Sequence, residues 1–389
     1  MKNILIITTK LSNGGAEKVV TNLADKLQEK YNVIIAVFNN KNQDYFCDAK
    51  IIDLKTKQTN NIIKKIYNLI VRFNKIKEIK KKYKIDCSIS FLTEPNLINS
   101  LTKKKEKIIV SIRNNLSEKK FKNILKFITK ITFKKADKIV VVSKHMEEDI
   151  KQKYLINNNK ITTIYNGCNQ NQIEKLSNEK IEGKYLEMFT SGKTIITMGR
   201  FNNQKAHWHL IRSFSNVVKE VPDAKLLLLG RGHLKKYLQN LIIDLKLEKN
   251  IKILEFQRNP YNFLKKCDIF IMPSLYEGMS NSIIEAMCCN LPVIATDCKY
   301  GNREILSKDW QKCGKINKME KVDYGVLIPT CDGIKYNANK ALTKEEIEMT
   351  KAILYVLKNK EKFVKCSIER KKDFKLEDRI KEWIEVIER

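Results

Sequence analysis

Hydrophobic residues in the first half of the chain form short uninterrupted runs separated by longer amphipathic stretches. Runs of about four to eight apolar residues are typical of buried parallel strands, and stretches with helical spacing between them predict crossover helices. The runs that predict strands are residues 2–8, 33–38, 87–91, 108–112 and 138–142. Because strands and helices alternate, we expect one βα domain over residues 1–168.

The pattern begins again after a polar interval. Residues 169–193 are polar without strong periodicity and predict a linker. A second strand series then predicts another βα domain over residues 194–373, and an amphipathic helix containing Trp383 covers residues 374–389. The predicted strands, two of them continuing into a loop, are residues 194–198, 225–230, 251–258, 267–273 and 326–329. A length of 389 residues suits two domains, each with its own core.

Residues 274–287 predict a loop that feeds a helix, directly after a buried strand. Ser280, Asn281 and Ser282 are residue types that cap helix starts by accepting backbone N–H bonds. A helix N-terminus carries partial positive charge and unpaired amides. We therefore expect an anion such as a phosphate to bind there.

Two glutamates flank this helix start. Glu285 falls in the second turn among apolar neighbours, where a buried carboxylate needs a hydrogen-bonding partner such as a ribose diol. Glu277, just before Gly278, is placed to meet a group beyond the phosphate, for example a sugar hydroxyl. The alternative is that both are solvated glutamates beside an ordinary helix, because carboxylates are mostly surface groups.

The whole stretch resembles the Glu-x7-Glu signature of the retaining glycosyltransferases of family four, which have the GT-B fold and use nucleotide sugars. Residues 286–297 look like the helix, turn and strand that follow in that family. Residues 301–305 resemble its Gly-Pro-Arg-Glu-Ile turn, with Asn302 in place of Pro. The resemblance runs from Gly14 to about Pro329. It implies an α/β fold of two facing Rossmann-like domains, an active site in the cleft between them, and a C-terminal helix that returns to the first domain.

The resemblance also assigns the donor site. Arg200 and Lys205 match a Gly-Arg-x-x-x-x-Lys element that neutralises the donor diphosphate, although two cations on a loop are also compatible with plain surface charge. Residues 230–232 resemble the family's Gly-x-Gly turn, and the loop ending at Arg258 is where family members hold the base. The implied catalytic residues are Glu277, Arg200 and Lys205, and the implied donor-binding residues are Glu285, Gly278, Met279, Ser280, Asn281, Gly15, Arg258 and Gly230.

A second group of residues is implied to contact the acceptor or the donor sugar. Residues 14–17 resemble the family's Gly-Gly-x-Glu turn, although a bare Gly-Gly also suits any tight turn. The turn lacks Gly-x-Gly-x-x-Gly, which disfavours a nicotinamide or flavin enzyme. Arg113 and Asn114 stand where many members carry a histidine, a departure from the family pattern. The assigned contacts are Gly14, Glu17, Arg113 and Asn114.

The amino-acid composition argues against several kinds of site and indicates the charge of the partner. Ten cysteines without a Cys-x-x-Cys pair, and only four histidines, argue against a metal cluster or disulfide framework and fit a reducing cytoplasm, with Cys288 and Cys289 as small helix fillers. No apolar run reaches the roughly 18 residues of a membrane span. The net charge of +31 indicates attraction to something anionic, although the excess of lysine partly reflects an AT-rich genome.

Two basic helices concentrate that charge, at residues 62–83 and 119–135. Their apolar stripes and dense lysines favour docking on the anionic inner face of a cell membrane, or simple packing on the sheet with solvated lysines. A nucleic-acid-binding protein is the rival of a different class. It is disfavoured because no recognisable motif is present and lysine outnumbers the arginine that reads bases.

We therefore expect a retaining glycosyltransferase that needs no cofactor besides its nucleotide-sugar substrate. The absence of any Asp-x-Asp predicts that it works without a metal. The resemblance implies a UDP-sugar donor carrying an N-acetylhexosamine or hexose. It implies a lipid-linked or surface-glycan acceptor, as in lipopolysaccharide or capsule assembly. The alternatives within the fold are a phosphorylase, a nucleotide-sugar epimerase or an inactive regulator.

Overall fold

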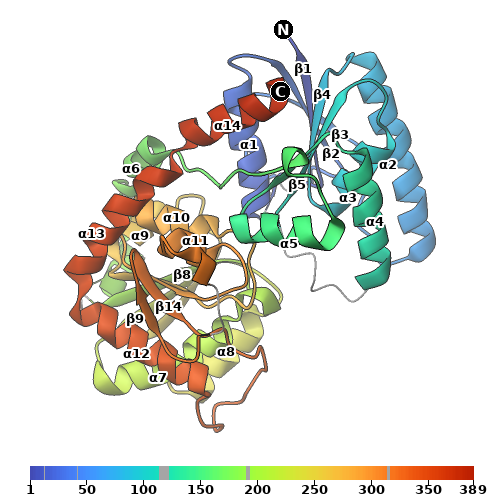
Figure 1. Cartoon of the computed structure of the whole chain (residues 1–389). Helices are drawn as coiled ribbons and strands as arrows, with labels where there is room; N and C mark the ends of the chain where they lie inside the picture. The colour runs from blue at the N-terminus through green and yellow to red at the C-terminus, as the bar shows by residue number, and fades with distance from the viewer. Residues whose placement is uncertain (13, 42, 114–121, 190–192, 313–315) are drawn as a thin grey trace. The chain divides into compact units, whose positions relative to one another are not determined.

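The computed structural model describes residues 1–12, 14–41, 43–113, 122–189, 193–312 and 316–389. The chain divides into two compact units, residues 1–166 with 377–389, and residues 167–376. Each unit is built on one sheet (Figure 1). The predicted α/β class with two Rossmann-like domains is confirmed.

The first unit contains a seven-stranded parallel sheet of order β3-β2-β1-β4-β5-β6-β7. Most of its strand residues are buried apolar residues, because helices cover both faces of a parallel sheet. The strands are β1 (Asn3–Thr8), β2 (Asn32–Val37), β3 (Lys50–Asp53), β4 (Cys87–Phe91), β5 (Lys107–Ile112), β6 (Lys138–Val141) and β7 (Ile161–Thr163).

Helices α2 and α3 pack on the face of this sheet that includes Leu5 and Ile7, and α1 lies on the other side (Figure 1). Asn61 and Ser143 cap α2 and α5 by accepting backbone N–H bonds from Lys64 and Met146. The helices are α1 (Gly15–Leu27), α2 (Ile62–Lys82), α3 (Thr93–Leu101), α4 (Lys122–Lys135), α5 (Lys144–Tyr154) and the 3₁₀ turn η1 (Asn158–Lys160).

The last helix, α14 (Leu376–Glu388), returns to the first unit. Its Trp383 is buried, with its ring centroid 5.9 Å from that of Phe91 in β4. Tyr31 donates a 2.6 Å hydrogen bond to Glu388. The sequence places an apolar stripe on this helix, and the first unit buries it.

The second unit contains a seven-stranded sheet of order β10-β9-β8-β11-β12-β14-β13. All described pairs are parallel except β13, which runs antiparallel to β14. The strands are β8 (Thr194–Met198), β9 (Lys225–Leu229), β10 (Ile251–Leu254), β11 (Ile269–Met272), β12 (Val293–Thr296), β13 (Glu320–Val322) and β14 (Gly325–Ile328).

The core of this unit includes the fully buried Trp208 and Phe214 of α7. Also in α7, Arg212 forms a buried ion pair of 2.9 Å with Glu346 of α12, whose N-cap is Thr343. The helices are α6 (Gln170–Ser177), α7 (His207–Glu220), α8 (Lys235–Asp244), α9 (Tyr261–Lys266), α10 (Asn281–Cys288), α11 (Asn302–Leu306), α12 (Lys344–Lys358) and α13 (Lys360–Arg370). The 3₁₀ turns are η2 (Gly183–Phe189), η3 (Asn203–Lys205), η4 (Trp310–Lys312) and η5 (Lys371–Phe374).

Two expectations about the chain's organisation need correction. Residues 169–193, predicted as a linker, contain α6 and belong to the second unit. Asn169 caps this helix and Ile173 is buried, but eight residues are too short to give a visible period. The edge strand β3 was not predicted, because an edge strand is short and only half-buried.

Both predicted basic helices are present, and one lysine of α2 differs from expectation. Helix α4 is described from Lys122, and residues 119–121 lie outside the described part of the chain. In α2, Lys80 is buried and its Nζ lies 2.8 Å from Glu106, whereas we expected it among the solvated lysines. Burial lowers the pKa of Lys80 to about 8.

Candidate functional site

The loop between β11 and α10 lies at the carboxyl end of the second sheet, where open α/β sheets bind ligands. Ser280 is the N-cap residue of α10, but its side chain accepts no capping hydrogen bond; its Oγ lies 3.2 Å from that of Ser282. The predicted capping by Ser280 is therefore wrong, because the neighbouring hydroxyl engages it instead. The positive end of the α10 dipole is consequently not masked by this side chain.

Gly301 allows the turn before α11 to approach the loop before α10 closely. Gly301 has φ of +80°, and a Cβ there would lie 2.4 Å from the Gly278 carbonyl oxygen and 2.7 Å from the Met279 Cα. Only glycine tolerates both the left-handed conformation and this contact. The turn before α11 therefore packs directly on the Gly278–Met279 backbone.

Lys205 and Glu277 form an ion pair of 2.7 Å between Nζ and Oε1. Lys205 ends η3, which follows β8, and Glu277 lies in the loop after β11, the neighbouring strand. Their side chains are only 12% and 9% exposed. The structure thus brings together two of the three predicted catalytic residues, while Arg200, on the same loop as Lys205, is exposed to solvent.

Glu285 is buried, and the Tyr261 hydroxyl donates to its Oε1 over 3.4 Å. Tyr261 opens α9 and is itself buried. The sequence predicted that Glu285 needs a partner but did not identify Tyr261. The sequence signal for this partner was Tyr261 itself, an aromatic residue directly after Pro260 in a polar segment that follows a strand. Arg258, three residues earlier, is exposed.

The loops after β8 and β9 contact each other closely. A Cβ at Gly230 would lie 1.9 Å from the Gly199 carbonyl oxygen, so no larger residue fits without movement. The Phe201 amide donates to the Arg231 carbonyl at 3.0 Å. The Arg231 guanidinium lies 4.7 Å from the centre of the Phe256 ring. Gly230 therefore serves loop packing, which fixes the segment that carries Arg200 and Lys205.

In the first unit, the predicted Gly-Gly turn forms the start of α1. Gly14 is the extended N-cap residue and Gly15 is the first helical residue. A Cβ on Gly14 would collide with the Glu17 carboxylate at 2.1 Å, so the Glu17 side chain folds back over the helix start. An acidic group there complements the helix dipole. Glu17 is buried, so its carboxylate is a fixed feature of this turn.

Arg113 follows β5 and its side chain is buried. Its Nη1 donates to Asn166 Oδ1 at 2.6 Å, while Nε and Nη2 are buried and have no hydrogen-bond partner among the described residues. The guanidinium lies 5.0 Å from the Phe91 ring centre and 6.0 Å from that of Trp383. Burial lowers the pKa of Arg113 to about 9, which still leaves it charged at neutral pH. Asn114 lies outside the described residues.

Known proteins resemble the chain over most of its length. Residues 13–172 match the family described as Glycosyltransferase Family 4, and residues 178–314 match the one described as Glycosyl transferases group 1. An uncharacterized glycosyltransferase of Methanocaldococcus jannaschii is 34% identical, over 88% of both chains. The chain belongs to glycosyltransferase family 4.

This family 4 glycosyltransferase also resembles a Campylobacter jejuni enzyme named as an N-acetylgalactosamine-N,N'-diacetylbacillosaminyl-diphospho-undecaprenol 4-alpha-N-acetylgalactosaminyltransferase. The two are 32% identical, over 79% of this chain and 84% of that enzyme. Among solved structures, the Anabaena HepE complex with UDP and glucose superposes with a TM-score of 0.77 at 15% identity and covers both chains fully. That likeness supports the GT-B fold.

The site residues of the family 4 glycosyltransferase are divided between its units. Those of the second unit follow β8, β9, β10 and β11, and those of the first unit follow β1 and β5. Within the described residues, no group of three or more His, Cys, Asp or Glu side chains is arranged to hold a metal ion. None of the described helices is long and apolar enough to cross a membrane.

Proposed function

We propose that this glycosyltransferase transfers a hexose or N-acetylhexosamine from a UDP-sugar to a lipid-linked glycan acceptor, with retention of anomeric configuration. The observation that carries the donor assignment is the cluster at the second sheet: the Lys205–Glu277 pair beside the start of α10, with Glu285 one turn further on. The printed names of relatives support the substrates. The Anabaena neighbour was solved with UDP-glucose, and the Campylobacter relative is named for a diphospho-undecaprenol acceptor.

In this proposal the second unit binds the donor. As the glycosidic bond breaks, negative charge grows on the departing diphosphate. Arg200, Lys205 and the α10 amides stabilise it from fixed positions. Because Lys205 is held by Glu277, its ammonium is oriented before the donor arrives. Glu277 has a second oxygen for a sugar hydroxyl, and Glu285, oriented by the hydrogen bond from the Tyr261 hydroxyl, accepts from the ribose hydroxyls.

We assign contacts with the sugar or the acceptor to the first unit. The Nε and Nη2 groups of Arg113, which are buried without a hydrogen-bond partner among the described residues, suit an anionic or hydroxyl-rich group that supplies acceptors. Glu17 places a carboxylate directly against Gly14, where a side chain would not fit. Asn114 remains a predicted contact on sequence grounds alone.

The decisive experiment is donor turnover with and without acceptor. The purified protein is incubated with UDP-glucose, UDP-galactose and their N-acetyl analogues, with or without an undecaprenyl-diphosphate-linked sugar. We expect free UDP only when acceptor is present, an α-linked product by NMR, and an unchanged rate in EDTA. Turnover that requires inorganic phosphate would identify a phosphorylase, and sugar conversion without UDP release would identify an epimerase. Loss of activity in EDTA that manganese restores would refute the metal-free mechanism.

We further propose that the protein works at an anionic membrane surface through the first two turns of α2. We call these residues the α2 patch; its apolar members, all more than half exposed, are Ile62, Ile63, Ile66, Tyr67 and Ile70. By contrast, Ile76 and Ile79 further along the helix are buried in the core. The apolar stripe that the sequence places along α2 is therefore only half used by the fold.

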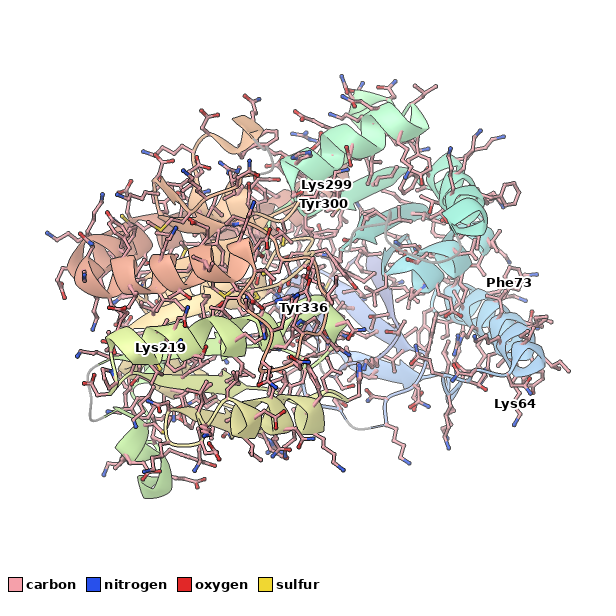
Figure 2. All side chains as sticks on the ribbon, turned by 90° about the horizontal axis from the view of Figure 1, so that it is seen from below. Lys64, Phe73, Lys219, Lys299, Tyr300 and Tyr336 are labelled. Atoms are coloured by element: carbon pink, nitrogen blue, oxygen red, sulfur yellow. The ribbon has the colours of Figure 1, made fainter. Side chains whose placement is uncertain are left out.

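Charge complementarity favours a lipid surface as the occupant of the α2 patch. Lys64 and Lys65 lie within the α2 patch and are exposed. The Lys64 side chain extends from the helix into solvent (Figure 2). Apolar side chains flanked by lysines are typical of helices that lie in the interface of an anionic bilayer. Each lysine near such a surface contributes up to about 1 kcal/mol, an attraction that salt screens.

Co-sedimentation with liposomes tests this docking. We expect binding to vesicles containing phosphatidylglycerol that weakens at high salt, little binding to neutral vesicles, and at least tenfold weaker binding for Lys64→Gln/Lys65→Gln. Ile63→Ser/Tyr67→Ser tests the apolar contribution. The matched control is Lys219→Gln/Lys249→Gln, which removes the same charge from exposed positions of the second unit. Equal loss in the control would mean that net charge alone, and not the α2 patch, drives binding.

A further inference from the structure

Two buried cysteines of the second unit have their sulfur atoms in unusually close contact. The Sγ atoms of Cys168 and Cys288 are 2.6 Å apart, although the residues are 120 positions apart in the sequence. This is shorter than a non-bonded contact between sulfur atoms and close to the roughly 2.05 Å of a disulfide bond. Neither cysteine is in a disulfide in the structure. Cys288, expected only to fill space in a helix, therefore has a specific partner.

The backbone holds both residues in place. The Cys168 amide donates to the Phe374 carbonyl at 2.9 Å, and its own carbonyl accepts from the Leu376 amide at 3.0 Å. Cys288 is the last residue of α10, where helix hydrogen bonds fix it. Neither sulfur needs a large backbone movement to bond to the other.

The neighbouring Cys289 provides an internal comparison. Its Sγ approaches the Tyr261 carbonyl oxygen at 3.9 Å and is directed to that side of the helix. Burial raises the pKa of Cys289 to about 12, which keeps it as an unreactive thiol. Of the two adjacent cysteines, only Cys288 has a second sulfur within bonding reach among the described residues.

We propose that Cys168 and Cys288 are a reversible disulfide site, oxidised by a low-molecular-weight disulfide such as glutathione disulfide. One cysteine loses its proton and attacks glutathione disulfide, which releases one glutathione and leaves a mixed disulfide. The other cysteine then loses its proton, attacks the protein sulfur of that bond and releases the second glutathione. Two protein thiols are oxidised and one glutathione disulfide is reduced to two thiols.

The bond would have a defined place in the fold. Cys168 lies two residues after Asn166, where the chain enters the second unit. Its backbone forms a parallel β-bridge with Lys375, just before the chain leaves that unit. Cys288 ends the helix that carries Glu285. The disulfide would therefore anchor the entry and exit segments of the second unit to α10 and close a covalent loop that contains Lys205, Glu277 and Glu285. This inference does not depend on the proposed substrates.

Thiol counting on the full chain tests the proposal. The reduced protein is equilibrated in buffers of falling glutathione to glutathione disulfide ratio, trapped with a maleimide and analysed by intact mass and peptide mapping. We expect the loss of two of the ten thiols, so that the oxidised protein carries two maleimides fewer than the reduced protein, and one cross-linked peptide pair containing Cys168 and Cys288. The oxidised form should also unfold about 4 °C or more above the reduced form, because the bond closes a long loop.

Matched variants separate this pair from general oxidation. Neither Cys168→Ser nor Cys288→Ser can form the cross-link. The variant that retains the attacking cysteine should stop at the mixed disulfide and carry one glutathione, whereas Cys289→Ser should lose two thiols to the cross-link, as the wild type does. A cross-link to Cys289, stable glutathione adducts in place of the bond, or ten thiols retained in glutathione disulfide alone would overturn the proposal. Peptide mapping of the wild type decides the matter even if a serine variant folds poorly.

Discussion

The pairing of Lys205 with Glu277 makes a prediction that separates positioning from simple stability. Removing the lysine as Lys205→Met leaves the Glu277 carboxylate nearly buried without its counter-ion. Breaking a buried pair in this way costs about 3–5 kcal/mol. Because about a tenth of each side chain remains exposed, we expect the lower end, about 3 kcal/mol.

The loss should appear in both folding and catalysis. For a domain of this size, about 3 kcal/mol lowers the unfolding midpoint by roughly 6–12 °C. A charge-assisted hydrogen bond to the diphosphate is worth about 1.5–3 kcal/mol, so turnover should fall by about 10- to 150-fold at a temperature where the variant is folded. Urea unfolding and donor turnover measure the two effects separately.

The double variant Lys205→Met/Glu277→Gln decides between the two roles. Removing both charges leaves no uncompensated ion, so the free energy of unfolding should return to within about 1 kcal/mol of the wild type. Turnover should stay low, because the cation that faces the diphosphate is still missing. Recovery of turnover together with stability would refute the donor role of Lys205.

An exposed ion pair of the same unit provides the control. Lys193 and Asp223 are 3.2 Å apart with side chains about half exposed, at the amino ends of β8 and β9. Such surface pairs contribute at most about 1 kcal/mol. Lys193→Met should therefore change stability by less than that and leave turnover unaltered. If Lys205→Met changes stability and turnover as little as Lys193→Met does, the buried Lys205–Glu277 pair is not needed for either.

Two further predictions concern Glu285 and His207. Calorimetry should show that the wild type binds UDP at least tenfold more tightly than 2′,3′-dideoxy-UDP. Glu285→Gln should lose most of this preference, and Tyr261→Phe should lose part of it. If the ratio of the two affinities is unchanged in Glu285→Gln, Glu285 does not contact the ribose. Burial lowers the pKa of His207 to about 3, so below pH 6.5 the unfolded chain binds a proton that the native state does not. Stability should therefore fall with pH in that window, by about 1.4 kcal/mol at pH 5.5. Urea unfolding at pH 7.5 and 5.5 should show this loss in the wild type and not in His207→Gln; equal losses would assign it to other groups.

Local sequence patterns were enough to predict most elements and the class of fold. The strand predicted at residues 194–198 coincides with β8, and the one at 87–91 coincides with β4. These runs are readable because a buried parallel strand needs apolar residues on both faces, a local requirement. The loop and helix at residues 274–287 were equally readable, because turn glycine and helix start are local signals.

Which side chains meet depends on how the elements pack together. Lys205 and Glu277 are 72 residues apart, and they pair because β8 and β11 are neighbours in a strand order that the sequence does not encode locally. The burial of Arg113 depends on Trp383, which arrives from the far end of the chain on α14. The same holds for Cys168 and Cys288, and for the division of the α2 stripe into a buried half and the exposed α2 patch. Periodicity tells which face of an element is apolar, but what covers that face is fixed only when all the elements pack.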